Sequence, residues 1–110
     1  MSDMTKEFRD RLEMFVAGCE RIASDNIKTR FRTLEPPVFY YTVGRKYVRV
    51  VKRHRDMDSG GSAHCFVDLE NGDVLLPASW RSPAKHARGN IFDDSNGLGN
   101  MGPYGPAYLR

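Results

Sequence analysis

The stretch HCFVDLENGDVLL, residues 64–76, decides the fold expected for this sequence of 110 residues. Its two ends are runs of β-branched, aliphatic and aromatic residues, and Asn71-Gly72 lies between them. Asn-Gly readily adopts the positive φ angles of a type I′ turn, whose twist suits a short hairpin. Residues 38–43 and 47–51 form a second pair of such runs, with Gly44 able to turn the chain between them. The two hairpins predict an antiparallel sheet of about four strands over residues 38–77.

An amphipathic helix is expected before the sheet, over residues 1–25. Its apolar residues recur in steps of three or four, which places on one helical face Met4, Phe8, Leu12, Phe15, Cys19 and Ile22. Ser2 or Asp3 can cap its N-terminus. Paired prolines at residues 36–37 favour an extended entry into the first strand. We expect this helix to pack on one face of the sheet, where Phe8, Leu12 and Phe15 meet core residues Val48, Val50, Cys65 and Val67.

The C-terminal third is expected to contain a short helix and an irregular tail. Residues 82–89 begin with Ser82 as a possible N-cap and Pro83 at the first helical position, and Gly89 can end the helix. Residues 93–110 are rich in Gly, Asn and Pro, which is typical of irregular structure. The order of helix, two hairpins, short helix and tail predicts one α+β domain over residues 1–110.

Composition favours an ordinary globular protein, since 40% of the residues are apolar and 28% are charged. No apolar run approaches the roughly 20 residues of a membrane span, and the N-terminus lacks the order of a secretion signal. We therefore expect a cytoplasmic protein that does not contact a membrane. Cys19 and Cys65 are too few for a disulfide scaffold and form no Cys-x-x-Cys pair, so both are predicted to be reduced core residues.

The sequence shows no pattern of catalytic residues. The histidines His54, His64 and His86 are scattered, and no Ser or Cys lies in a recognisable nucleophile context. The acidic residues that follow the strands are expected to be solvated. The glycine-rich run at residues 97–102 follows no predicted strand and opens no predicted helix, unlike a dinucleotide-binding loop. These observations predict a protein that is not an enzyme and that needs no metal or other cofactor.

The positive charge is local. The net charge is only +3, but residues 45–55 hold six basic side chains and no acidic one. Side chains alternate between the two faces of a strand, so every second residue of this run is expected on the face away from the helix. These residues are Arg45, Tyr47, Arg49, Val51, Arg53 and Arg55. His64, Phe66 and Asp68 are expected on the same face. Such a surface suits stacking of bases and binding of phosphates. The alternative is an ordinary solvated face on which the C-terminal tail covers Tyr47 and Phe66.

The start of the predicted short helix is a second candidate site. A helix N-terminus presents free N–H groups and a partial positive charge, both of which favour an anion. Trp80 can stack on a base there, and the nearby cations are Arg81, Lys85 and Arg88. The alternative makes Trp80 a core anchor, because a buried Trp contributes a large apolar area to a small domain.

Several runs resemble small orphan proteins encoded by tailed bacteriophages. They are YVRVV (47–51), GSAHCFVD (61–68), NGDV (71–74), PASW (77–80), PAKHAR (83–88) and YGPAYL (104–109). The resemblance covers the C-terminal two-thirds of the chain and leaves the N-terminal helix outside. It implies a viral accessory protein that acts in the cytoplasm of a bacterial host. That family has no settled activity, so the resemblance assigns no site residue.

Three functions remain open. The first is binding of nucleic acid through phosphates at the basic aromatic face and the Trp80 helix start. The second is a protein–protein module that binds or inhibits a host factor or joins the virion. The third is sequestration of a nucleotide defence signal, with Trp80 over the base and basic residues on the phosphates.

Overall fold

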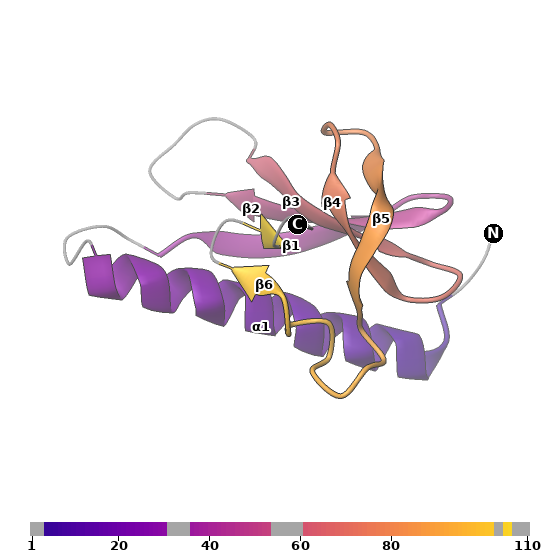
Figure 1. The fold of residues 1–110 in the computed structure, drawn as a ribbon, viewed down its shortest axis with the longest axis horizontal. Helices are drawn as coiled ribbons and strands as arrows, with labels where there is room; N and C mark the ends of the chain where they lie inside the picture. The colour runs from indigo at the N-terminus through magenta and orange to yellow at the C-terminus, as the bar shows by residue number, and fades with distance from the viewer. Residues whose placement is uncertain (1–3, 31–35, 54–60, 103–104, 107–110) are drawn as a thin grey trace.

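The structure is a long helix packed against a curved antiparallel sheet (Figure 1). The computed structural model describes residues 4–30, 36–53, 61–102 and 105–106. Helix α1 comprises Lys6–Arg30. The five-stranded sheet has the order β1-β2-β3-β4-β5, in which each strand pairs antiparallel with the next. Its strands are Val38–Val43, Tyr47–Arg53, Ser62–Asp68, Asp73–Pro77 and Pro83–Asn90. This arrangement confirms the predicted α+β class and antiparallel sheet.

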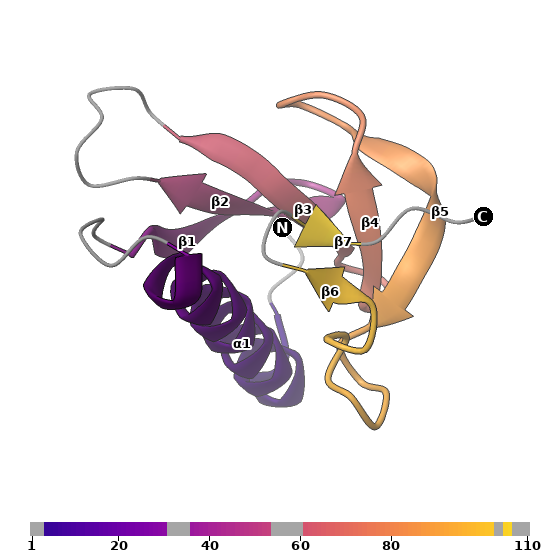
Figure 2. The same ribbon diagram turned by 60° about the vertical axis from the view of Figure 1, so that its left-hand side comes forward.

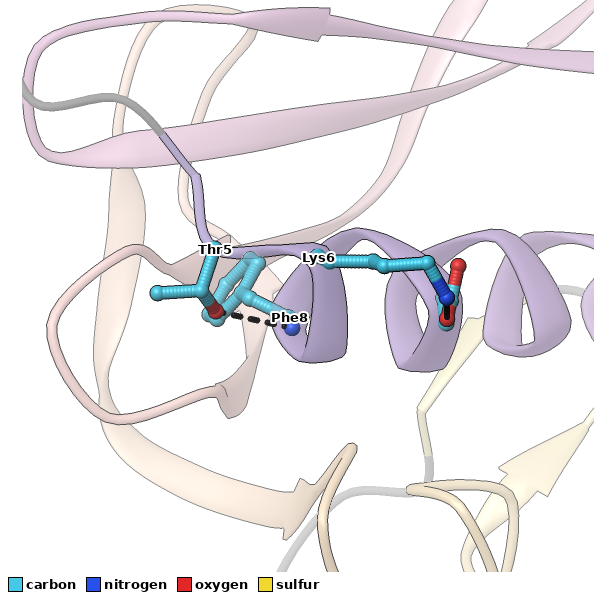
Figure 3. Close-up of polar contacts among 4 residues, drawn as sticks. Thr5, Lys6 and Phe8 are labelled. Carbon is cyan, nitrogen blue, oxygen red and sulfur yellow. Dashed lines mark hydrogen bonds and ion pairs between the residues drawn. The ribbon is translucent and has the colours of Figure 1, made fainter.

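Helix α1 is capped by Thr5, and the predicted caps Ser2 and Asp3 lie outside the described residues. The Phe8 N–H donates to Thr5 Oγ1 at 3.0 Å, one turn into the helix (Figure 3). An exposed pair between Lys6 and Asp10 links the following turn at 3.2 Å. The helix continues five residues past the predicted end at 25, because Ile27 prolongs the apolar stripe and is buried.

The core forms between α1 and the inner face of the sheet, as predicted. Phe8, Leu12 and Phe15 from the helix pack with Val48, Val50, Cys65 and Val67 from β2 and β3, and all seven are buried. Cys19 and Cys65 are buried free thiols. Burial, together with the neighbouring Cys19 thiol, raises the pKa of Cys65 well above its ordinary value.

The edge strand β1 is tied to the helix by polar contacts. Glu20 accepts a hydrogen bond from the backbone N–H of Phe39 at 3.1 Å, and the Tyr41 hydroxyl donates to Glu13 at 3.1 Å. A carboxylate on an edge N–H satisfies a group that would otherwise be open to another strand. These contacts hold α1 along β1, on the side of the sheet that faces the core.

Residues 82–89 do not form the predicted short helix. Residues 83–89 belong instead to β5, which pairs with β4 from Asp73↔Asn90 to Pro77↔Pro83. Ser82 is part of the β4–β5 turn, where its carbonyl accepts the N–H groups of Ala78 and Ser79 at 3.0 and 3.1 Å. A helix of eight residues is marginal in isolation. Pairing with β4 instead satisfies the backbone groups along that strand's open edge.

The β3–β4 hairpin is confirmed, but its turn is not of type I′. That turn requires positive φ at both central residues. Here Gly72 has φ +83°, whereas Asn71 is absent from the described non-glycine residues with positive φ. Asn71 instead accepts the Asp73 N–H through its side chain at 2.9 Å. This Asx contact stabilises the turn without a left-handed Asn.

His64 points to a different face from the one predicted. The pairing of β2 with β3 steps from Val50↔Cys65 to Val51↔Ala63, so His64 is an extra residue in a β-bulge. Its ring meets Phe39 edge-on, with centroids 4.8 Å apart, and the residue is 3% exposed. Strict alternation therefore fails at this position. Val51 also differs from the expectation of an exposed residue, since it is fully buried.

The described part of the C-terminal tail is ordered against the helix. Arg11 donates to the carbonyl oxygens of Ile91 and Asp93 at 2.7 and 2.6 Å, and Asn96 donates to the Arg11 carbonyl at 3.0 Å. Strands β6 (Met101–Gly102) and β7 (Gly105–Pro106) then form a small hairpin. Figure 2 shows this hairpin between α1 and the β3–β4 part of the sheet. The predicted irregular tail is thus in part a packed segment.

Candidate functional site

A cleft of about 530 Å³ opens at the tip of the β1–β2 hairpin. It lies on the face of the sheet that points away from α1. Its lining comes from the hairpin tip, the middle of the sheet and the β4–β5 turn, and comprises Thr42, Val43, Gly44, Arg45, Lys46, Tyr47, Arg49, Phe66 and Arg81. The cleft therefore brings together five residues that the sequence singled out: Arg45, Tyr47, Arg49, Phe66 and Arg81.

Two aromatic side chains form the floor of this cleft. The rings of Tyr47 and Phe66 meet edge-to-face, with centroids 6.2 Å apart. Tyr47 is partly exposed, whereas Phe66 is 2% exposed. The prediction of an exposed Phe66 is therefore wrong. Its cross-strand partner Leu75 is also buried, so the outer face has a small apolar layer of its own. Phe66 can support Tyr47 from below, and Tyr47 alone offers a ring surface to a ligand.

Arg49 is held rigidly beside Trp80. Its Nε donates to the Trp80 carbonyl oxygen at 2.9 Å, and its guanidinium carbon lies 4.3 Å from the centre of the indole ring. This is a cation–π geometry that orders the arginine side chain. Within the described part of the chain, the two terminal nitrogens of Arg49 have no hydrogen bond. They remain donors for an acidic group.

Trp80 is not the core anchor that the alternative interpretation predicted. Its side chain is 42% exposed on the β4–β5 turn. Ser79 Oγ accepts the N–H groups of Arg81 and Ser82 at 3.3 and 3.2 Å, which fixes the backbone on both sides of the arginine. Arg81 is exposed and extends to the same cleft as Arg49.

Four other predicted site residues do not join this cleft, and one of them has no described structure. Arg53 is exposed at the far end of β2, opposite Val38. Arg55 lies outside the described residues. Lys85 and Arg88 are in β5, so the predicted helix N-terminus that would place them around an anion does not exist. In the described structure, Nε and Nη1 of Arg88 are buried without a hydrogen-bond partner.

A second cleft of about 410 Å³ adjoins the first and was not predicted. Arg45, Lys46 and Tyr47 line both clefts, and the remaining lining residues are Asp68, Leu69 and Glu70. Asp68 is the register partner of Tyr47 on the neighbouring strand. Lys46 was visible in the sequence as part of the basic run. Only the pairing of β2 with β3 brings the acidic residues next to it.

Among the described residues, no group of three or more His, Cys, Asp or Glu side chains is assembled as a set of metal ligands. In the same part of the chain, no helix is both long and apolar enough to cross a bilayer.

Part of the chain is similar to a ribosomal protein. It is 41% identical over 58 residues to small ribosomal subunit protein uS17 of Drosophila yakuba, a match that covers 50% of this chain and 35% of that protein. The uS17 of Drosophila pseudoobscura pseudoobscura is 40% identical over 58 residues with the same coverage. The chain thus spans about a third of the length of these curated relatives. No solved structure matches the chain.

The comparison with protein families gives a match over residues 3–102, which include α1, the whole five-stranded sheet and the cleft. The match agrees with the expectation of a family without a settled activity, whereas a phage origin stays a prediction. On this match, the chain belongs to a family of unknown function, DUF7717.

Proposed function

We propose that this domain is a non-enzymatic protein that binds single-stranded nucleic acid in the cleft at the β1–β2 tip. One observation carries the proposal: the cleft has four basic lining residues and, among the described residues, no acidic one. The four are Arg45, Lys46, Arg49 and Arg81. Like charges gathered in one cleft repel one another, and a phosphate chain relieves this repulsion while it releases counterions.

The aromatic residues of the cleft favour a ligand with bases as well as phosphates. Tyr47 offers a partly exposed ring in the cleft, and the exposed Trp80 lies next to the cleft residue Arg49, whose guanidinium covers one face of the indole. Proteins that bind single strands combine a basic groove with aromatic rings on which bases stack. A duplex hides its bases inside the helix, so it cannot use these rings.

The comparisons add a weaker support. The relatives that match half of this chain are named as proteins of the small ribosomal subunit, which is consistent with a ligand of the nucleic-acid type. The resemblance to phage orphan proteins would place such a domain in the cytoplasm of a bacterial host.

The test compares two charge reversals on the same strand. We expect Arg49→Glu to abolish binding of a fluorescent single-stranded oligonucleotide in an anisotropy titration at about 50 mM salt, where charges are only weakly screened. Arg53→Glu makes the same change of charge at an exposed position outside the cleft, so it should retain most of the affinity. Equal losses in both variants would contradict the cleft as the site. Absence of binding by the unmodified protein would contradict the proposed function.

A second candidate is a protein partner, which the exposed apolar residues favour. Trp80 and Tyr40 are each 42% exposed and Val43 is 49% exposed. Trp and Tyr are enriched among residues that dominate protein interfaces. Capture of a partner that survives nuclease treatment and is lost in Trp80→Ala would favour this candidate. For a free nucleotide signal, the third possibility, added nucleotides should raise the melting temperature by mass action.

A further inference from the structure

The basic cleft continues into a cleft of a different chemical character. Arg45, Lys46 and Tyr47 line both, but the second cleft also contains the carboxylates of Asp68 and Glu70. A phosphate chain that runs from one cleft into the other therefore meets two carboxylates beside Tyr47, in addition to the Arg45 and Lys46 cations that the clefts share. Carboxylates repel phosphates, so the part of the second cleft next to Asp68 favours a different part of the ligand.

Asp68 is oriented to accept a hydrogen bond. Its Oδ1 accepts the backbone N–H of Glu70 at 2.8 Å, which fixes the plane of the carboxylate. Within the described part of the chain, its Oδ2 has no hydrogen-bond partner. The residue is partly exposed and opposes Tyr47 in the pairing of β2 with β3. An ionised carboxylate only accepts hydrogen bonds, so its partner in a ligand must be a donor.

A sugar hydroxyl is one donor that this arrangement can reach. In every nucleotide the sugar lies between the base and the phosphate. With a base on Tyr47 and a phosphate on Arg49, the sugar lies beside Tyr47. Directly opposed residues of paired strands have Cβ atoms about 5 Å apart, which places Asp68 within reach of that sugar. Inside a chain, deoxyribose has no hydroxyl donor, whereas ribose has its 2′-hydroxyl.

We infer that Asp68 accepts a hydrogen bond from a ribose 2′-hydroxyl, so that the cleft prefers single-stranded RNA to single-stranded DNA. The inference rests on the proposed function. Acidic side chains recognise ribose hydroxyls in the same way in dinucleotide-binding sites. The two adjoining clefts then divide one ligand, with phosphates on Arg49 and Arg81 and the sugar on Asp68.

The test uses three labelled ten-residue oligonucleotides that share one base: uridine RNA, deoxyuridine DNA and 2′-O-methyl-uridine RNA. The methylated strand keeps the 2′-oxygen but loses the donor. We expect the unmodified protein to bind the RNA about ten-fold more tightly than either other strand, the size of effect of one hydrogen bond to a charged group. Asp68→Asn should remove the preference, because it replaces the accepting Oδ2 by an amide nitrogen, which can only donate a hydrogen bond. The control Asp94→Asn makes the same change of charge in an exposed loop, so it should retain the preference for RNA.

Each outcome decides between the proposals. Equal binding of RNA and DNA, or binding of the methylated strand as tightly as RNA, would overturn the role of Asp68 and leave nucleic-acid binding intact. An Asp68→Asn variant that retains the full preference would also overturn it. If the protein binds none of the three strands, the proposed function itself is overturned. The methylated strand tests the inference on the unmodified protein, so the result does not depend on the folding of the variant.

Discussion

His64 illustrates how a single buried group couples stability to pH. It is 3% exposed, its Nε2 has no hydrogen-bond partner in the described structure, and Phe39 packs on its ring. Burial, and next the charge of Lys52, lower the pKa of His64 to about 4. The folded protein therefore resists protonation at a pH where the unfolded chain already accepts a proton.

This difference predicts a loss of stability on acidification. Because the folded-state pKa lies below the ordinary 6.5, the free energy of unfolding should fall as the pH drops from about 6.5 to about 4 and then level off. The total loss should be up to about 3 kcal/mol, from 1.36 kcal/mol per pKa unit. Urea unfolding across this range measures it. His64→Leu cannot titrate, so its curve should lack this slope; parallel curves for the two proteins would contradict the prediction.

Asp93 should affect a lower pH window. The hydrogen bond from the Gly97 N–H and those from Ser95 and Asn90 lower the pKa of Asp93 below its usual 3.8, against a smaller opposing effect of burial. Its ionised form therefore stabilises the fold at neutral pH, and this contribution is lost only as the pH falls below about 4. Most of the His64 window therefore lies above that of Asp93, so the His64 slope is measured between about pH 6.5 and pH 5.

At the scale of the elements, helix α1 is attached to the sheet mainly by its apolar stripe. Phe15 is fully buried in the core, and Met14 on the same turn is 57% exposed. Phe15→Ala should lower the free energy of unfolding by about 3–5 kcal/mol, since truncation of a buried Phe removes packing and leaves a cavity. Met14→Ala should change it by less than about 0.5 kcal/mol, as surface substitutions do. Thermal or urea unfolding compares them, and similar values for both would place the helix elsewhere.

The segment after β5 depends on Arg11 in α1. Its side chain donates to two carbonyl oxygens, those of Ile91 and Asp93. Arg11→Ala should lower the free energy of unfolding by about 1.5–3 kcal/mol, the range for hydrogen bonds to a charged group. It should also speed amide exchange at residues 93–97. Arg21→Ala, an exposed arginine on the same helix, is the control; unchanged exchange in Arg11→Ala would show that other contacts hold this segment.

At the scale of the whole molecule, the net positive charge is small, but the basic side chains are concentrated in one cleft. The net charge is +3, whereas the basic cleft alone contains four cationic lining residues. If all four meet phosphates, the logarithm of the binding constant should fall with the logarithm of salt concentration with a slope of about −3 for a single strand. Arg81→Ala should make this slope less steep by about 0.7. Tyr47→Ala should weaken binding but leave the slope unchanged. An unchanged slope in Arg81→Ala would remove that residue from the phosphate site.

Local patterns alone determined much of this protein. Steps of three and four between Phe8, Leu12 and Phe15 define a helical face whatever lies opposite it, because the helix repeats every 3.6 residues. Alternation likewise identified Val48 and Val50 as core residues. The basic run at residues 45–49 was readable for the same reason, since charges adjacent in sequence stay near one another in any fold.

Tertiary structure decided the rest, because strand pairing joins residues that are distant in sequence. Residues 82–89 have the end signals of a helix, but the open edge of β4 offers more hydrogen bonds than an isolated turn. The bulge that turns His64 into the core depends on how β3 meets β2, which no local period encodes. The two adjoining clefts exist only because Arg81 from the β4–β5 turn and Asp68 from β3 come to the same hairpin tip as Tyr47, Arg81 in the first cleft and Asp68 in the second. A sequence read in one dimension cannot place these three side chains together, since their proximity is a property of the folded sheet.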